Sequence, residues 1–179
     1  MRRFAAQWTV LDQLTLPVSV EASRASVLIR RADQGDLGAI MRLLADDPVS
    51  AGRGDAASGV DEPAYAAGLD RILADPGNDL LVAVDETTGV VGTLQLTLIP
   101  GMARRGSTRL LVEAVRVASS ERSSGIGTAL MRWVTGPAAR ELGATLVQLT
   151  SDAARVDAHR FYTRLGFVDS HVGFKYTVV

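Results

Sequence analysis

The chain of 179 residues contains no cysteine, which excludes disulfides, zinc–thiolate and iron–sulfur centres, and a cysteine nucleophile. With only two histidines, it also cannot build a metal site from three of them. Lysine is nearly absent, because Lys175 is the only one among 19 basic residues and the others are arginine. Aromatic residues make up only 5% of the chain, whereas 17 glycines are present.

An excess of charge of one sign is also missing. The 19 basic and 20 acidic residues leave a net charge of −1 at pH 7. A chain this balanced has no overall electrostatic attraction for nucleic acid or for an anionic membrane. No segment reaches the roughly 18 to 20 continuous apolar residues that cross a bilayer. We therefore expect a cytoplasmic protein that binds neither nucleic acid nor membrane.

The N-terminal residues 1–26 do not read as a targeting signal. Polar residues interrupt any apolar core, and no clean cleavage site follows. We expect an extension of uncertain structure outside the main domain. It could be an extra strand or arm, or residues upstream of the natural start. Residues 27–179 are expected to form the domain itself, because the chain is long enough for one sizeable core and short for two.

Apolar periodicity predicts a mixed α/β domain. The expected helices cover 35–46, 61–75, 125–142 and 157–165, with a flexible loop at 47–60 and a kink at Gly136-Pro137. The expected strands cover 26–32, 80–84, 90–99, 108–118 and 144–150, followed by two strands within 167–179.

The most informative stretch is 110–131, where an apolar strand leads into a short loop and glycines open a helix. The first N–H groups of a helix lack intrahelical partners, and the helix dipole is positive at that end. Gly125 and Gly127 have no Cβ, so an anion can approach the main chain closely. Arg122 adds a full positive charge nearby. The stretch therefore predicts a site for a phosphate group.

Two common phosphate motifs do not fit this loop. A dinucleotide fingerprint needs G-x-G-x-x-G early in the chain, and here a third glycine at that spacing is missing. A P-loop needs G-x-x-x-x-G-K-[ST], but the lysine position holds Gly127.

The sequence R-S-S-G-I-G at 122–127 resembles the acyl-CoA pyrophosphate loop of the GNAT superfamily of N-acetyltransferases, Q/R-x-x-G-x-G/A. A second stretch, AHRFYTRLGF at 158–167, is similar to the family's later motif A-x-x-F/L-Y-x-x-x-G-F. The order of elements over 27–179 agrees as well. The resemblance implies a mixed, strongly twisted sheet of about six to seven strands flanked by about four helices.

The resemblance also implies that acetyl-CoA is the co-substrate and that no metal is required. Its pantetheine arm would enter between two diverging strands and pair with the main chain of Val115, Arg116 and Val117. A main-chain N–H near Val115 or Arg116 would polarise the acyl carbonyl. The pyrophosphate would rest on the loop formed by Arg122, Ser123, Ser124, Gly125, Ile126, Gly127 and Thr128.

Tyr162 occupies the tyrosine position of the second motif, where its hydroxyl would protonate the leaving thiolate. Its alternative role is that of a half-buried helix residue that packs through its ring. Glu113 is the candidate general base, because an attacking amine must lose a proton directly or through water. Alternatively, Glu113 reaches solvent at the mouth of the sheet or pairs with an arginine. Strand alternation places Glu113 on the same face as Val115 and Val117.

Alternation also places Arg116 on the opposite face, where it would pair with a substrate carboxylate or with a local aspartate. Arg155 stands where many family members have asparagine contacting the cofactor, which puts that contact in doubt. Ser151 or Asp152 would then supply it.

The resemblance thus implies an acetyl-CoA-dependent N-acetyltransferase. It would act on a primary amine of a small molecule or peptide, by direct attack in a ternary complex. The alternative is a non-catalytic acyl-CoA-binding sensor or interaction module with the same fold. The loops at 47–62 and 100–107 and the last hairpin would set the acceptor. Pairing of terminal elements would allow a homodimer, with residues 1–26 as an arm.

Overall fold

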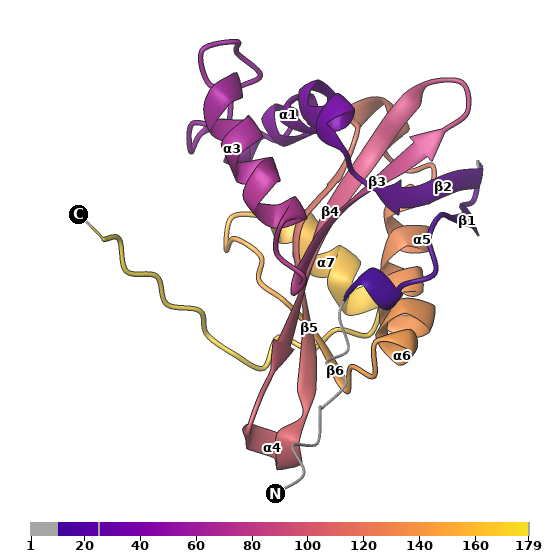
Figure 1. The fold of residues 1–179 in the computed structure, drawn as a ribbon, viewed down its shortest axis with the longest axis vertical. Helices are drawn as coiled ribbons and strands as arrows, with labels where there is room; N and C mark the ends of the chain where they lie inside the picture. The colour runs from indigo at the N-terminus through magenta and orange to yellow at the C-terminus, as the bar shows by residue number, and fades with distance from the viewer. Residues whose placement is uncertain (1–10, 25, 179) are drawn as a thin grey trace, which may run out of the picture.

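The computed structural model describes residues 11–24 and 26–178. Its centre is one six-stranded sheet in which the strands lie side by side in chain order (Figure 1). Neighbouring strands are antiparallel except for the last pair, β5 and β6, which is parallel. The strands are β1 (Val18–Glu21), β2 (Ser26–Arg31), β3 (Asn78–Asp85), β4 (Gly89–Pro100), β5 (Thr108–Val117) and β6 (Leu146–Leu149). This mixed sheet confirms the predicted fold class.

The helices include the four predicted stretches and two short helices in segments predicted as loops. They are α1 (Leu37–Ala45), α2 (Pro48–Ala51), α3 (Glu62–Leu73), α4 (Ala103–Gly106), α5 (Ile126–Trp133), α6 (Ala139–Glu141) and α7 (Val156–Arg164). The turn before α1 begins with a capping box formed by Asp33 and Asp36. None of the described helices has the length and apolar content needed to span a membrane.

The predicted kink at Pro137 is present. Between α5 and α6 the chain makes a π-helical turn, Val134–Ala138, because proline has no N–H to continue the α-helical pattern.

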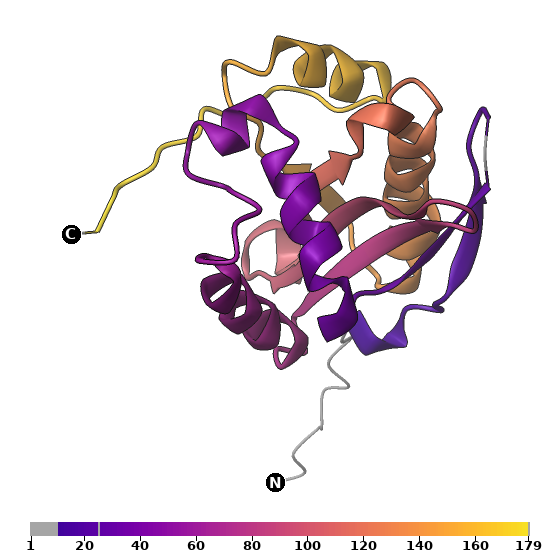
Figure 2. The ribbon, with the colours of Figure 1, turned by 90° about the horizontal axis from the view of Figure 1, so that it is seen from above.

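Helices cover both faces of the sheet (Figures 1 and 2). On one face, Leu80 and Val82 of β3 pack with Ile40 of α1 and Leu69 of α3. The other face carries the larger core, in which strand residues such as Leu110 pack with α5 and α6. Several side chains of α7 also pack against this larger core. The face covered by α1 and α3 and the face covered by α5 and α7 are therefore distinct surroundings.

The described part of the N-terminal extension, residues 11–24, belongs to the sheet and the core. Strand β1 pairs with β2, and the side chains of Leu11 and Leu14 are buried in the larger core. Thr15 binds the Glu141 carboxylate of α6 through both its N–H and its hydroxyl. Of the alternatives for this extension, the structure shows the extra strand, which begins before the expected boundary at residue 27. Residues 1–10 lie outside the described residues.

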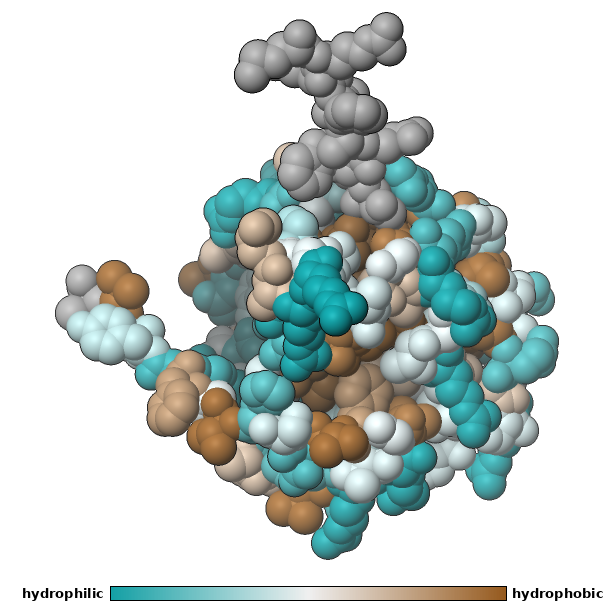
Figure 3. Space-filling view, turned by 90° about the horizontal axis from the view of Figure 1, so that it is seen from below, coloured by the Kyte–Doolittle hydropathy of each residue, from teal (hydrophilic) through white to brown (hydrophobic). Residues whose placement is uncertain are grey.

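The prediction of two final strands is wrong for the described residues. From Phe167 to Val178 the chain pairs with no strand, and its end runs away from the body of the molecule (Figures 1 and 3). An isolated hairpin is at best marginally stable in water, and apolar alternation alone cannot supply a partner. The loop predicted at 47–60 also contains one short helix, α2, whose N-cap Asp47 accepts from the Ser50 N–H at 2.8 Å.

Candidate functional site

Strand β5 changes its surroundings halfway along. Its first part pairs with β4 on one side and with β6 on the other, where the register runs from Arg109–Leu146 to Val112–Leu149. Beyond Val112 only the pairing with β4 continues. We call Thr108–Val112 the paired half and Glu113–Val117 the open half of β5. The strands thus part at the position where the family resemblance implies entry of the pantetheine arm.

A β-bulge marks the change. Arg116 lies opposite Thr93 and Glu113 lies opposite Gln95, so two residues of β5 face the single residue Leu94. Ala114 has a φ of 49°, a left-handed conformation that is uncommon for residues other than glycine. A bulge of this kind bends the strand and interrupts its ladder.

The bulge corrects the predicted faces of β5. Val115 and Val117 pack against the larger core, as Leu110 and Val112 do. Residues opposite each other in a sheet share a face, so Glu113 and Arg116 lie with Gln95 and Thr93 on the α1 and α3 side. Uninterrupted alternation predicts the opposite arrangement. Glu113 is exposed.

The glycine loop leads into α5 as predicted. The α-helical hydrogen bonds begin where the Ala129 N–H donates to the Gly125 carbonyl at 2.9 Å. The N–H groups of Gly127 and Thr128 therefore have no intrahelical acceptor. Ser124 is buried, and its hydroxyl donates to the Glu121 carbonyl at 2.6 Å, which holds the loop closed.

Ser23, in the turn after β1, occupies the space beside Gly125. The φ of Gly125 is 93°, and a Cβ there would overlap the Ser23 hydroxyl and lie 2.7 Å from the Ser23 nitrogen. Glycine is thus required at 125 so that the turn after β1 can approach the loop. A Cβ at Gly127 would make ordinary contacts with Phe161 and Val117, at 3.6 and 3.7 Å. The Ser23 contact and the positive φ are therefore sufficient reasons for glycine at 125.

Arg122 and Ser123 are exposed beside the loop. A guanidinium nitrogen of Arg122, Nη2, donates to the Asp46 carbonyl just after α1 at 3.3 Å. The Asp46 carboxylate in turn accepts from the Ser119 N–H at 2.7 Å. These contacts join the end of α1 to the segment before the loop and place the Arg122 charge at the loop's outer edge.

Tyr162 lies on α7, and its ring packs edge-on against Phe161 and Phe167, with centroids 5.2 and 5.7 Å away. Burial raises the pKa of the Tyr162 hydroxyl above its ordinary value, although the charges of Arg116 and Arg155 oppose this shift. The hydroxyl thus keeps its proton at neutral pH and can act as a proton donor.

Two side chains at the opening between β5 and β6 carry a buried polar atom without a hydrogen-bond partner within the described residues. They are Arg116, through its Nε, and Ser151, through its Oγ. Arg116 belongs to the open half of β5, and Ser151 follows β6 by two residues. Buried polar groups are normally hydrogen-bonded. These two atoms indicate a site for a polar ligand.

Arg155, the departure from the family pattern, pairs with Asp47. Both of its terminal nitrogens donate to the Asp47 carboxylate, Nη1 at 2.6 Å. A second ion pair joins Arg53 to Asp152. The segment around α2 is therefore held against the segment before α7. Sequence reasoning missed Asp47 and Ser50, although Asp47-Pro48 is a helix-start signal.

Neither histidine is hydrogen-bonded to Arg155, Asp47 or Ser50 within the described residues. His159 bonds through Nε2 to the Asp152 carbonyl at 2.8 Å, and His171 bonds to the Ser170 hydroxyl within the C-terminal segment.

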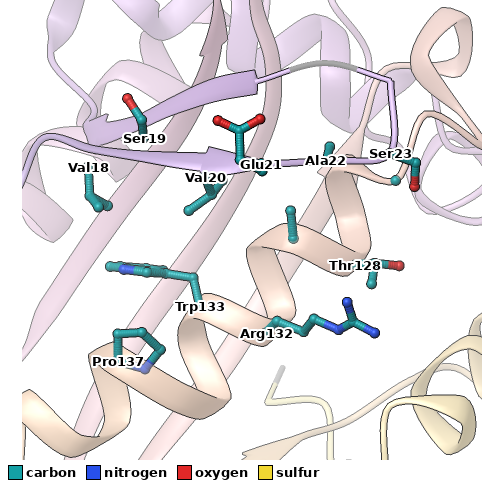
Figure 4. A pocket seen from close by; sticks show the side chains of 12 residues that line it. Val18, Ser19, Val20, Glu21, Ala22, Ser23, Thr128, Arg132, Trp133 and Pro137 are labelled. Atoms are coloured by element: carbon teal, nitrogen blue, oxygen red, sulfur yellow. The ribbon is translucent and has the colours of Figure 1, made fainter.

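A surface groove of about 420 Å³ lies between β1 and α5 (Figure 4). Trp133 of α5 faces Val18 and Val20 of β1 across it. The groove reaches the glycine loop only through Gly125 and Thr128, and neither half of β5 lines it. It is therefore separate from the opening between β5 and β6.

Comparisons with known proteins agree with this geometry. The sequence profile of the acetyltransferase (GNAT) family matches residues 39–167. An aminoalkylphosphonate N-acetyltransferase from Salmonella typhimurium is 43% identical over 53 residues. That match covers 30% of this chain, and the chain spans only 34% of the length of that relative.

Solved structures resemble almost the whole fold. A transcriptional regulator from Bacillus halodurans is 39% identical, with a TM-score of 0.76 and 85% of this chain and 99% of that chain covered. An acetyltransferase from Trypanosoma brucei is 26% identical, with a TM-score of 0.64 and coverage of 85% and 99%. Glucosamine-6-phosphate N-acetyltransferase from Arabidopsis thaliana, 18% identical with a TM-score of 0.65 and coverage of 83% and 96%, shares the fold. The resemblance found in the sequence is confirmed, and the chain belongs to the GNAT acetyltransferase family.

Proposed function

We propose that this protein transfers the acetyl group of acetyl-CoA to a primary amine of a small molecule or peptide, by direct attack in a ternary complex. The observation that carries this proposal is the open half of β5, which leaves one strand edge unpaired. Tyr162, whose hydroxyl keeps its proton, packs against the same core as Val115 and Val117 of this half. Membership of the GNAT family supports acetyl transfer.

The residues around the opening fit acetyl-CoA. The unpaired edge at Val115, Arg116 and Val117 can hydrogen-bond an extended amide-containing chain, as an added strand would. The free N–H groups of Gly127 and Thr128 and the positive end of α5 suit the pyrophosphate. The buried Ser151 hydroxyl, which has no hydrogen-bond partner among the residues that the structure describes, can complete its hydrogen bonding on the ligand. Bound acetyl-CoA supplies the acetyl group as a thioester.

The protein's own contribution is the movement of protons. Tyr162 donates its proton to the sulfur when the carbon–sulfur bond breaks, so that a thiol leaves. Glu113, exposed on the open half, takes the proton that the amine loses as its nitrogen bonds to the acetyl carbon. The N–H groups near the bulge at Ala114 polarise the acetyl carbonyl.

The names of two relatives suggest what to assay. The Salmonella relative is named for an aminoalkylphosphonate acceptor, so an aminoalkylphosphonate belongs among the amines tested. The Bacillus relative is named a transcriptional regulator, which favours the second candidate, a protein that binds acyl-CoA without turnover.

The test is thiol release from acetyl-CoA, followed with a panel of amines that includes amino acids, aminoalkylphosphonates, aminoglycosides and peptides. Calorimetry with CoA accompanies it. Amine-dependent thiol release together with an acetylated amine product supports the transferase. Tight CoA binding without turnover on any amine supports the sensor, and failure to bind CoA contradicts both.

A further inference from the structure

Arg116 is a partly buried cation without a carboxylate partner among the described residues. Its Nη2 donates to the Ser50 hydroxyl at 2.6 Å, and its Nη1 donates to the Val115 carbonyl at 2.8 Å. Its Nε–H is buried and has no acceptor within the described part of the chain. Burial lowers the pKa of this guanidinium, with the nearby charge of Arg155 acting in the same direction. A buried charge normally has an opposite charge or a full set of hydrogen bonds.

A second guanidinium, that of Arg155, is hydrogen-bonded to the same Ser50 hydroxyl. Arg155 donates to the Ser50 hydroxyl at 3.3 Å while it pairs with Asp47. The Arg155 and Asp47 side chains are only 18% and 17% exposed. Two cations and one carboxylate thus meet around Ser50 and leave one positive charge in excess. The Asp55 carboxylate also raises the pKa of Arg116, but less than the Asp47 carboxylate does.

This cluster borders the position where the acetyl group would react. The positive charges of Arg116 and Arg155 both act on the Tyr162 hydroxyl, where they oppose the effect of burial on its pKa. Arg116 also belongs to the open half of β5, on the α1 and α3 side. An amine that attacks beside Tyr162 would therefore bring its other substituents close to the cluster.

We propose that Arg116, with Arg155 and Ser50 beside it, binds an oxyanion of the acceptor, a carboxylate or a phosphonate a short chain away from the reacting amine. The inference rests on the proposed acetyl transfer and adds the class of acceptor. An oxyanion supplies the negative charge that Arg116 lacks, and charge-assisted hydrogen bonds are stronger than neutral ones.

The test compares three amines of similar size: 2-aminoethylphosphonate, β-alanine and uncharged propylamine. We expect kcat/KM to be about tenfold to a hundredfold higher for at least one anionic amine than for propylamine. Arg116→Gln should remove most of this preference through the acceptor KM, and Arg116→Lys should restore part of it. The matched control is Arg140→Gln on the exposed surface of α6, which should keep the preference.

Each outcome separates the two proposals. Equal turnover of charged and uncharged amines contradicts the anion site and leaves acetyl transfer intact. A preference for the anionic amine that survives in Arg116→Gln has the same meaning. If no amine is acetylated, acetyl transfer fails, and calorimetry with 2-aminoethylphosphonate on the CoA-loaded protein still tests the anion site. Binding that Arg116→Gln weakens at least about tenfold supports the site, and no binding or undiminished binding overturns it.

Discussion

The two halves of β5 differ in what lies along their outer edge. In the paired half, Leu110 and Val112 are 0% and 1% exposed, and β6 continues the ladder on the outer side. In the open half the same strand keeps β4 on one side and has no strand on the other. Ala114, with its positive φ, lies near the junction of the two halves.

This contrast shows how one strand serves both stability and a binding site. A continuous ladder would satisfy every main-chain group of β5 and leave none for a ligand. The bulge and the end of β6 together free one edge at the position where Arg116 and Ser151 lie. Bulges are frequent beside active sites because they redirect side chains and end pairing.

The largest expected effect on stability is in the paired half. Leu110→Ala should lower the free energy of unfolding by about 2–5 kcal/mol, because it leaves a cavity at a fully buried position. Urea denaturation measures this change. Turnover per folded molecule should stay near the wild-type value, and a loss of turnover in the folded variant would contradict the division between the halves.

The largest expected effect on catalysis comes from a substitution at Tyr162, the proposed proton donor at the open half. Tyr162→Phe keeps the ring packing but removes the proton donor, so kcat should fall about a hundredfold or more. Thiol release across the pH range measures it. Tyr176→Phe, at an exposed position, is the control and should keep full turnover. Full turnover of Tyr162→Phe at every pH would remove the proposed acid.

A substitution at the junction should affect both properties. Ala114→Val places a β-branched residue at a φ of 49°, which should cost about 1–2 kcal/mol of stability. It should also lower turnover, since the bulge sets the main chain of the open half. Ala114→Gly tolerates this conformation and serves as the control. Equal thermal stability and turnover of the two variants would show that the bulge does not set the site.

The smallest expected effect is on the stability of the fold at acidic pH, through the Asp47 carboxyl. Burial tends to raise the pKa of Asp47, but the Ser50 N–H, Arg155 and the charge of Arg116 outweigh it and hold the pKa below the ordinary 3.8. The unfolded chain then binds a proton more readily than the folded one, so this stabilisation is present above pH 3.8 and is lost as pH falls through the lower folded pKa. Asp47→Asn should flatten that part of the stability–pH curve, as measured by urea denaturation between pH 2 and 6. An unchanged curve would contradict the pairing.

Much of the fold could be predicted because its signals are local. The capping box at Asp33, the glycine loop before α5 and the break at Pro137 each depend on residues close together in the chain. The two GNAT motifs indicated the family, because their spacing reflects a loop and a helix that form locally.

Other features could not be read in this way. Arg155 and Asp47 are 108 residues apart, and only the folded chain brings them into contact. The face that carries Glu113 depends on a bulge at an alanine, a residue that gives no sign of a left-handed conformation. The role of Gly125 beside Ser23 depends on the turn after β1, which sequence reasoning placed outside the domain.

By itself the sequence determined most of the elements, their order and the family, because hydrophobic period, caps and glycines act over a few residues. The tertiary structure alone decided where β5 loses its neighbour, which face carries Glu113 and Arg116, and how the arginines around Ser50 are partnered. Those outcomes depend on contacts between distant segments, whose geometry is set only when the sheet and its helices pack together.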